Sequence, residues 1–360
     1  MQFPSTDGFL VREVSVADEP LYLVYPRLQS TEWTPETLKF RSSVWTKDGI
    51  LVSAGFKKFF YHGEKPGLYP VFPTDLGNVS CVEKIDGSCL IVSKYKGHPI
   101  IRTRRCFDAT THEESGSDIE FFRQKYPKAF DNDVLDGGYS LIYEWTTPSF
   151  RIVIDYGEEP QLTLLGAIHH SDYEMVDQNG VDELSQVLGI PRPRRYTFDS
   201  LEHMIESVKA FEDKEGICAY YNHDQNIVKI KGLRYLTVHA FLSKCSTKTL
   251  FDLYLEHGSP SYEELESYIT RGFDYECAVF AKPYLDELYD GVAELNTRIR
   301  DAKHLIEKWK SRPRRDFAKF LNENYPKHVP TLVFFFMDHP DEELSGNMLR
   351  QSLKKCLPNG

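Results

Sequence analysis

The chain has 360 residues, of which 41% are hydrophobic and 27% charged, and these values are close to those of folded globular proteins. Such a composition excludes long disordered tracts, fibrous proteins and small disulfide-stabilised scaffolds, and the length predicts two domains or one large one. The 43 lysines and arginines against 54 aspartates and glutamates give a net charge of −11, so a nucleic acid would have to bind at a local basic patch.

Residues 38–240 alternate strand-like segments with turns. Asp48-Gly49 and the Gly97 turn each separate two apolar runs, which predicts two hairpins. A helix with Ser200 as its N-cap is expected over residues 201–211. We therefore predict an antiparallel α+β domain. Its strand-like segments are 44–45, 50–52, 90–95, 100–104, 139–144, 151–156, 162–168, 217–221 and 227–231.

The hydrophobic period changes after residue 243. Apolar residues spaced three and four apart between Leu285 and Trp309 predict a long amphipathic helix that packs in a bundle. Shorter helical patterns follow at 316–323 and 342–355, and the three phenylalanines at 334–336 favour a buried core segment. We predict an all-α C-terminal domain over residues 243–360, preceded by one domain over residues 1–242.

The seven cysteines form no C-x-x-C pair and no cluster with histidine at zinc spacing, which predicts reduced thiols in a cytoplasmic protein. The first ten residues lack the basic and apolar regions of a secretion signal. The longest apolar run, residues 332–337, is too short to span a bilayer. We therefore expect no membrane segment.

The segment Glu83-Lys84-Ile85-Asp86-Gly87-Ser88 is the first candidate for chemistry. Lys84 and Asp86 are two residues apart and could face one cavity, while Gly87 lets the backbone come close to a ligand. This arrangement suits a lysine nucleophile at a pocket. Taken alone, K-x-D-G is a weak signal, and an exposed turn before a strand is the alternative interpretation.

Further charged residues lie in apolar strand-like segments. Glu144 within Leu141-Ile142-Tyr143-Glu144-Trp145, and Glu215 before Gly216, are costly to bury unless each meets a cation or a metal. Lys229 and Lys231 share one strand face, as phosphate-binding lysines would, and Arg102 and Arg104 repeat that spacing. A solvated strand face remains the alternative for each element alone.

The order KIDGS, YEW, EGIC and VKIK resembles the covalent nucleotidyltransferase superfamily of ATP-dependent ligases and mRNA capping enzymes. Upstream, Arg41-Ser42-Ser43-Val44 and Phe56-Lys57-Lys58-Phe59-Phe60 look like elements of the phage RNA ligase 1 family, the tRNA-repair ligases. The resemblance covers about residues 38–240. The chain departs from the family pattern at Ser42, where glycine is usual, and at Arg105, where a small residue is usual.

The resemblance implies an antiparallel-sheet, ATP-grasp-like nucleotidyltransferase domain that joins 5′-phosphate and 3′-hydroxyl RNA ends. Lys84 would form lysyl-AMP from ATP, with Mg²⁺ or Mn²⁺, before AMP passes to the RNA 5′-phosphate and the 3′-hydroxyl displaces it. Lys229 and Lys231 would assist at the phosphates, and nearby cations would favour the neutral form of Lys84. The implied nucleotide-binding residues are Arg41, Lys58, Phe60, Glu83, Asp86, Gly87, Arg104, Glu144, Gly216, Cys218, Lys229 and Lys231.

Within that set, the resemblance gives narrower roles to a few residues. Glu215 and Glu144 are the implied metal ligands, and Glu144 would also contact the ribose. Phe60 and Cys218 would pack against adenine. The implied partner is RNA, including broken tRNA, and we expect a monomer in the cytoplasm, that of the host cell if the protein is viral.

Three alternatives to an RNA ligase stay open. DNA ligases and mRNA guanylyltransferases share the lysine motif, but they normally add an OB-fold barrel whose strand pattern is missing here. A binding module that has lost catalysis is the third, and the joint presence of Lys84, Glu144, Glu215, Lys229 and Lys231 argues against it. A covalent adduct with labelled ATP would distinguish the enzyme from the module.

A basic cluster lies in the expected helical domain. The segment from Lys303 to Lys319 contains seven lysines and arginines but only two carboxylates. A basic run of this kind is often a solvated helix end, favoured by the helix dipole. The functional interpretation is that Arg312, Arg314 and Arg315 contact the RNA backbone.

Overall fold

The computed structural model describes residues 8–27, 31–64, 67–111, 113–272 and 275–357. Part of the segment examined for a secretion signal, residues 1–7, lies outside these ranges. The chain divides into two compact units, Met1–Leu236 and Thr237–Gly360. Among the described residues, no helix is both long and apolar enough to cross a lipid bilayer. The seven cysteines are all free thiols.

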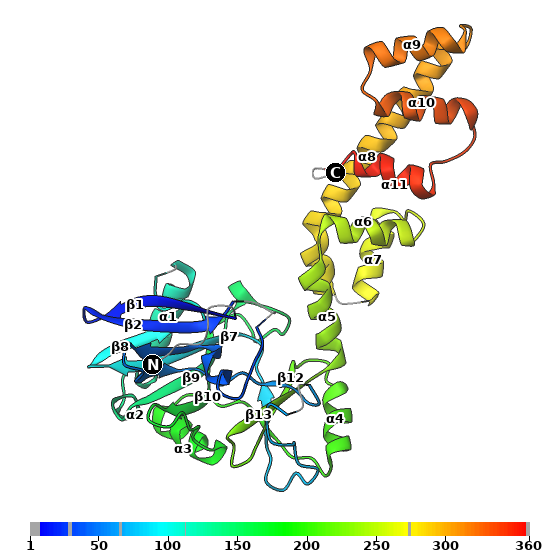
Figure 1. Ribbon diagram of the computed structural model, residues 1–360. Coiled ribbons are helices and arrows are strands. Elements are labelled where there is room, and N and C mark those ends of the chain that lie inside the picture. The colour runs from blue at the N-terminus through cyan, green and yellow to red at the C-terminus, as the bar shows by residue number, and fades with distance from the viewer. Residues whose placement is uncertain (1–7, 28–30, 65–66, 112, 273–274, 358–360) are drawn as a thin grey trace. The chain divides into compact units, whose positions relative to one another are not determined.

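Three sheets occur among the described residues of the first unit, and Figure 1 labels strands of each. One sheet has the order β1 (Phe9–Val16), β2 (Glu19–Pro26), β3 (Ser43–Thr46) and β4 (Leu51–Ala54). The second has the order β10 (Gln161–His169), β9 (Tyr139–Thr146), β7 (Ser88–Tyr95) and β8 (His98–Arg102). The third has the order β11 (Arg195–Tyr196), β6 (Ser80–Lys84), β12 (Gly216–Tyr221), β13 (Asn226–Lys231) and β5 (Phe60–Tyr61).

The strand pairs are antiparallel except for β13 with β5, which confirms the expected α+β class with antiparallel sheets. Both predicted hairpins are present, as β3 with β4 and β7 with β8. Lys96 and Gly97 have φ values of 50° and 80° at the second turn, the left-handed pair that a two-residue hairpin requires. The predicted pairing of 217–221 with 227–231 is also confirmed, as β12 with β13.

Two hydrophobic cores lie on opposite faces of the β10-β9-β7-β8 sheet. Leu141, Tyr143 and Trp145 of β9 pack into one core, whereas Ile142 packs into the other. Because side chains alternate along a strand, Glu144 faces the same side as Ile142. The second core is shared with Val82, Cys218 and Tyr220 of the β6 and β12 strands, so this carboxylate points toward the space between two sheets.

Helices cover the outer faces of the first unit. These helices are α1 (Glu113–Lys125), α2 (Asp133–Asp136), α3 (Gln178–Leu188) and α4 (Leu201–Lys209), with short 3-10 turns at Leu38–Arg41, Pro127–Ala129 and Pro148–Phe150. The predicted helix after Ser200 is confirmed as α4, and the Ser200 hydroxyl accepts a hydrogen bond from the His203 N–H. The β1-β2 hairpin and helices α1 and α3 have no counterpart among the sequence predictions.

The predicted strand at 151–156 is wrong, because this segment is irregular in the structure. The N–H groups of Val153 and Ile154 donate to the Asp86 carboxylate instead of to a neighbouring strand. The predicted common face of Arg102 and Arg104 is also wrong. Strand β8 ends at Arg102, so the alternation stops there; Arg102 is fully buried and Arg104 is exposed.

Helices joined by turns and loops make up the second unit in its described residues, with no strand among them. Helix α5 (Leu233–Lys244) leads into α6 (Thr247–Glu256), α7 (Tyr262–Gly272), α8 (Tyr275–Trp309), α9 (Arg314–Asn324), α10 (His328–Asp338) and α11 (Gly346–Lys354). The predicted long helix is confirmed as α8, which begins ten residues before Leu285 and packs against α6, α7, α10 and α11. The helix expected over 342–355 starts later, at Gly346, and α10 was not predicted as a helix.

Candidate functional site

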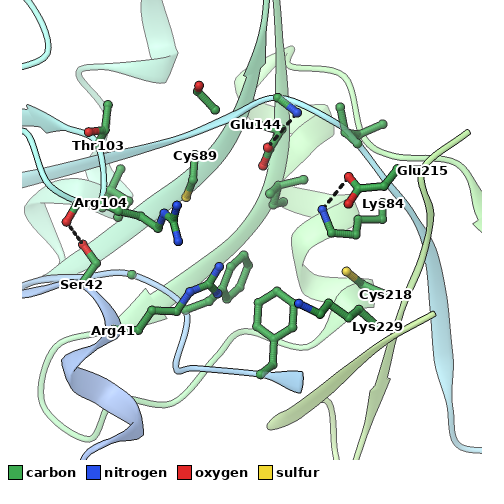
Figure 2. Close-up of a pocket in the computed structure, with 18 of the residues that line it drawn as sticks. Arg41, Ser42, Lys84, Cys89, Thr103, Arg104, Glu144, Glu215, Cys218 and Lys229 are labelled. Atoms are coloured by element: carbon green, nitrogen blue, oxygen red, sulfur yellow. Dashed lines mark hydrogen bonds and ion pairs between the residues drawn. The ribbon is translucent and has the colours of Figure 1, made fainter. Parts of the chain in front are cut away.

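A cavity of about 560 Å³ lies in the first unit between the β6-β12-β13 strands and the β7-β9 strands. Figure 2 shows Lys84, Glu215 and Lys229 on one side of it and Arg41 and Arg104 on the other. Most of the residues singled out from the sequence line this cavity. They are Arg41, Glu83, Lys84, Gly87, Arg104, Glu144, Glu215, Cys218, Lys229 and Lys231.

Glu215 connects two lysines of the cavity. Its Oε2 atom lies 2.6 Å from Lys84 Nζ, and its Oε1 atom lies 2.8 Å from Lys231 Nζ. The carboxylate is only 2% exposed, so the two ammonium groups compensate a buried charge. We name Lys84, Glu215, Lys229 and Lys231 the lysine wall of the cavity.

Strand register explains why Glu215 reaches both lysines. Gly216, at the start of β12, pairs with Lys84 of β6 on one side and with Lys231 of β13 on the other. Glu215 precedes this position and therefore lies between the two strand ends. Gly216 has a φ of +151°, and a Cβ atom there would lie 2.1 Å from the Ile230 carbonyl oxygen. The close three-strand register thus requires glycine at this position.

The charge of Lys84 is set mainly by two opposing effects. Burial lowers the pKa of Lys84, but the charge of Glu215 and its hydrogen bond raise it, and the net pKa lies above the ordinary lysine value. The Glu215 carboxylate, which the sequence analysis did not pair with Lys84, decides this direction. Lys84 is held as an ammonium by its carboxylate partner.

Lys229 has the opposite environment. Burial, followed by the charges of Lys58, Lys231 and Arg41, lowers the pKa of Lys229 to about 8. Its Nζ lies 4.3 Å from the centre of the Tyr61 ring. Lys229 therefore joins the cavity as a cation without a carboxylate contact of its own among the described residues, and an anionic ligand would favour its charged form.

Glu144 of β9 also lines the cavity. Its Oε1 atom accepts a hydrogen bond from the Gly87 N–H at 3.1 Å, drawn in Figure 2. Burial raises the pKa of Glu144 to about 7, although the Lys84 charge and the Gly87 hydrogen bond act in the opposite direction. A Cβ atom at Gly87 would lie 2.4 Å from the Trp145 carbonyl oxygen, so this contact also needs glycine.

The opposite side of the cavity, which we name the arginine wall, consists of Arg41, Arg104 and Arg105. The Arg41 guanidinium stacks on the Phe59 ring at 4.5 Å, and burial, then the charge of Arg104, lowers the Arg41 pKa. Phe59 lines the cavity, whereas Phe60, in β5 beside β13, does not line it and packs against Tyr69. The expected contact between Phe60 and a base therefore does not match its position.

Lys58 and Glu83 also depart from the expected arrangement. Lys58 does not line the cavity, and its Nζ lies over the Phe60 ring at 4.8 Å. The Glu83 carboxylate accepts a hydrogen bond from the Tyr196 hydroxyl at 3.1 Å. Because Lys84 and Glu83 are adjacent in β6, their side chains leave opposite faces of the sheet.

Asp86 does not line the cavity with Lys84, so the prediction of one shared cavity is wrong. Lys84 ends β6, and the chain turns before Asp86. The buried Asp86 carboxylate instead accepts the Val153 and Ile154 N–H groups at 2.9 and 3.2 Å and the Tyr235 hydroxyl at 2.7 Å. Asp86 therefore anchors the loop at 152–156, whose Ile152 lines the cavity.

Arg102 supports the arginine wall from behind. It is 0% exposed, and its guanidinium donates to the Ser53 and Ser42 hydroxyls and to the carbonyl oxygens of Ser42, Ser53 and Thr103. Burial lowers the Arg102 pKa to about 10, which leaves the group charged at neutral pH. Because Ser42 follows Arg41 and Thr103 precedes Arg104, these bonds fix the backbone that carries the wall.

A match to a known family decides the classification. The family model described as RNA ligase (RNA_lig_T4_1) matches residues 40–249, more than half of the chain. The chain belongs to the RNA ligase family. This confirms the resemblance inferred from the sequence motifs.

Two curated relatives are longer than the region that this chain shares with them. A candidate RNA ligase of Thermovibrio ammonificans is 27% identical over 221 residues, which cover 59% of this chain and 56% of the relative. A candidate bifunctional polynucleotide kinase/RNA ligase of Autographa californica nuclear polyhedrosis virus is 27% identical over 220 residues, 55% of this chain and 30% of the relative. The matched region thus spans about half of the first relative and less than a third of the second.

Solved structures are more distant. An archaeal ATP-dependent RNA ligase aligns with a TM-score of 0.46 at 14% identity, covering 79% of this chain and 76% of the other. A Naegleria gruberi RNA ligase with pyrophosphate aligns with a TM-score of 0.39 at 15% identity, covering 46% and 52%. At these scores the likeness adds nothing to the family assignment, which rests on the sequence match.

The cavity offers a limited donor set for a metal. No group of three or more His, Cys, Asp or Glu residues that could hold a metal ion occurs among the described residues. Mg²⁺ usually binds one or two carboxylates together with substrate phosphates. Glu215 and Glu144 fit that pattern, because both line the cavity beside the cations expected to contact phosphate.

One arginine of the basic cluster is already paired with a carboxylate of the second unit. Arg314 donates two hydrogen bonds to Asp338 at 2.7 and 2.9 Å. Arg312 lies 4.5 Å from the centre of the Trp309 ring. Arg315 is exposed and has no hydrogen-bond or ion-pair partner in the described part of the chain. Of the three predicted RNA contacts, Arg315 is thus the most available.

Proposed function

We propose that this protein is an ATP-dependent RNA ligase that joins 5′-phosphate and 3′-hydroxyl ends through lysyl-AMP and RNA-adenylate. The observation that carries the proposal is the lysine wall, where Lys84 opens onto a cavity between Glu215, Lys231 and Lys229. Lys84 is the proposed nucleophile. The other lysines would stabilise charge that develops on the phosphates of ATP.

The ion pair between Lys84 and Glu215 defines what must change before attack. An ammonium cannot act as a nucleophile, and this pair keeps Lys84 protonated. When Glu215 turns to another cation, the charge that raises the Lys84 pKa is removed, and burial then lowers that pKa. A divalent metal held by Glu215, with Glu144 beside it, would supply such a cation and would polarise the α-phosphate.

The remaining site residues receive roles from their positions in the cavity. Lys229 and Lys231 would contact phosphate oxygens, and Arg41 and Arg104 would do so from the opposite wall. Glu144 would contact the ribose, and Cys218 and Phe59 would lie against adenine. Glu83 would contribute through its backbone, since its carboxylate is held by Tyr196.

RNA is the proposed partner, and broken tRNA is the proposed physiological substrate. A tRNA substrate would use the basic cluster of the second unit, because phosphate contacts position a structured RNA without reading its sequence. We expect a monomer in the cytoplasm. Sealing of a nicked tRNA beside a linear oligonucleotide tests this choice, and equal rates on both would remove the support for tRNA.

The alternatives differ in the nucleotide that is covalently bound or in the nucleic acid that is sealed. A guanylyltransferase would form lysyl-GMP from GTP, and a DNA ligase would seal nicked DNA faster than RNA. Incubation with α-labelled ATP or GTP, followed by denaturation, identifies the nucleotide that is covalently bound. Labelling by ATP and sealing of RNA are expected, whereas no covalent adduct with either nucleotide would favour a binding module.

The basic cluster can be tested without disturbing adenylylation. Replacing Arg312, Arg314 and Arg315 by Ala should weaken RNA binding, while lysyl-AMP formation stays near wild type because it needs only ATP and metal. Each lost phosphate contact with single-stranded RNA should lower the salt slope of binding by about 0.7. Arg315→Ala should account for a large share, since Arg314 is paired with Asp338. Unchanged affinity and salt slope would assign the cluster a structural role.

A further inference from the structure

Arg105 is a cation at the cavity that the roles above leave unused. Its side chain is exposed and lines the cavity together with Arg104. Among the residues that the structure describes, it has no hydrogen-bond, ion-pair or ring partner. An exposed guanidinium without a protein partner, next to a site for phosphates, is available to an anionic ligand.

The backbone around Arg105 is held firmly. The Thr103 N–H donates to the Cys106 carbonyl oxygen at 2.9 Å, and the Cys106 N–H donates to the Thr103 hydroxyl at 3.2 Å. Ser42 donates to the Arg104 carbonyl oxygen at 3.0 Å, as Figure 2 shows, and buried Arg102 holds the Thr103 carbonyl. This turn therefore presents Arg105 from a fixed base.

Arg105 and its neighbour Arg104 are exposed, whereas the other cations that line the cavity are less so. Arg104 already has a proposed role at the phosphates of ATP, which leaves Arg105 for another ligand. Lys84 and Lys231 are paired with Glu215, and Arg41 is stacked on Phe59. These groups are largely covered, whereas Arg105 is exposed, as is Ile152, another lining residue, at 39%. A small nucleotide can be enclosed among the covered cations. The end of a long strand has to enter from solvent, because the rest of the polymer stays outside.

We propose that Arg105 binds the 5′-terminal phosphate of the RNA strand and places it for transfer of AMP. This inference rests on the proposed function and adds the recognition of one substrate end. A terminal phosphate carries more charge and more free oxygens than the internal diesters, and a guanidinium can donate two parallel hydrogen bonds to it. Arg105 therefore distinguishes a phosphorylated end from a 5′-hydroxyl end.

The test compares the binding of two oligoribonucleotides of one sequence, with a 5′-phosphate or a 5′-hydroxyl, to the intact protein without ATP. Wild type should prefer the phosphorylated strand, and Arg105→Ala should reduce its affinity for that strand about tenfold, with little change for the hydroxyl strand. Arg105→Lys should retain part of the preference. Arg12→Ala, which removes an exposed arginine of β1 that does not line the cavity, is the matched control and should behave as wild type.

Lysyl-AMP formation measured in the same variants separates this inference from the proposed function. Arg105→Ala should form lysyl-AMP at the wild-type rate and slow only the next step with phosphorylated RNA. The same end preference in Arg105→Ala and wild type would overturn the inference. A raised KM for ATP in Arg105→Ala with an intact end preference would assign Arg105 to ATP and would also overturn it. Absence of lysyl-AMP in wild type would instead refute the proposed function.

Discussion

The two walls of the cavity bring cations to one space by different means. On the lysine wall, Lys84, Lys229 and Lys231 stand on strands, and the buried carboxylate of Glu215 balances two of them. On the arginine wall, Arg104 and Arg105 follow the end of β8 and Arg41 ends a 3-10 turn. Their support is Arg102, a buried cation whose acceptors are hydroxyl and carbonyl oxygens.

Because of this difference, mutations in the two walls should have different effects. A carboxylate between two ammonium groups sets their charge state, so a change at Glu215 should alter chemistry more than folding. A guanidinium that satisfies several buried carbonyl groups sets geometry, so a change at Arg102 should alter stability and ligand binding together. Variants at these two residues therefore test whether the lysine wall controls the chemistry and the arginine wall controls geometry and stability.

Glu215→Gln should have the largest effect. Glutamine cannot balance two ammonium groups, so the pKa of Lys84 should fall and favour the neutral nucleophile. The rate of lysyl-AMP formation should nevertheless drop about a hundredfold, because the proposed metal ligand is lost. Single-turnover adenylylation and a pH titration of Lys84 measure the two effects.

The control for this variant is Glu212→Gln, an exposed position in the same loop, which should leave the rate unchanged. A Glu215→Gln protein that forms lysyl-AMP at or above the wild-type rate would show that Glu215 only holds Lys84 protonated. The proposed metal role would then be wrong.

Arg102→Met should destabilise the protein by about 3 to 5 kcal/mol, because it leaves several buried acceptors without a donor. It should also raise the KM for ATP about tenfold by displacing Arg41 and Arg104. Arg102→Lys should restore the charge but not the bonds, and should rescue neither value. Thermal unfolding and steady-state adenylylation provide the measurements.

Phe122→Ala gives a matched loss of stability away from the wall. Phe122 is fully buried in the core on the other face of the β10-β9-β7-β8 sheet, and its truncation should cost about 3 to 5 kcal/mol. Under conditions in which Phe122→Ala is folded, the KM of this variant for ATP should stay near the wild-type value. An equal rise in KM in both variants would mean that Arg102 has no specific positioning role.

Lys231→Ala should slow adenylylation at least tenfold, or roughly 1.4 kcal/mol of transition-state stabilisation, with little loss of stability. The lysine wall keeps Lys84 to balance Glu215, so folding should tolerate the change. Lys209→Ala, at the exposed end of α4, serves as the control. Wild-type single-turnover kinetics in Lys231→Ala would assign this lysine only a role in balancing Glu215.

Glu144 should make a smaller, pH-dependent contribution to stability. Its pKa rises from an ordinary 4.5 to about 7 in the folded state, so the folded protein binds more protons than the unfolded chain between these values. Stability contributed by this group should therefore fall as pH rises from about 4.5 to 7, on the order of 1 to 3 kcal/mol. Glu144→Gln should flatten that decline in urea unfolding. An unchanged slope would contradict the burial of this carboxylate.

Strand periodicity predicted part of the lysine wall, because side chains two residues apart in a strand share a face. Lys229 and Lys231 lie two residues apart in β13, and Glu144 shares the face of Ile142 in β9. Spacing along a strand was sufficient to place Lys229 and Lys231 on one face, whereas the order of the motifs and the family resemblance were needed to bring them to one site with Lys84, Glu144 and Glu215. The register that places Glu215 between Lys84 and Lys231 could not be predicted, since it depends on which strands pair.

The same reasoning failed where strands end. Alternation stops after Lys84 and after Arg102, so Asp86 and Arg104 do not continue the face of the preceding residue. Tyr235, which donates to Asp86, was missed because a tyrosine in an apolar helix gives no signal of its partner. Phe59 and Phe60 were likewise confused, since both residues of an aromatic pair fit a nucleotide base equally well by composition.

The most direct measurement of the central claim is the site of covalent labelling by ATP. The protein is incubated with α-labelled ATP and a divalent metal, denatured and digested, and the peptide that carries AMP is identified by mass spectrometry. The account predicts AMP on Lys84, no adduct in Lys84→Ala, and sealing of pre-adenylylated RNA that survives in that variant. AMP on another residue, or an adduct of wild-type yield in Lys84→Ala, would contradict the account.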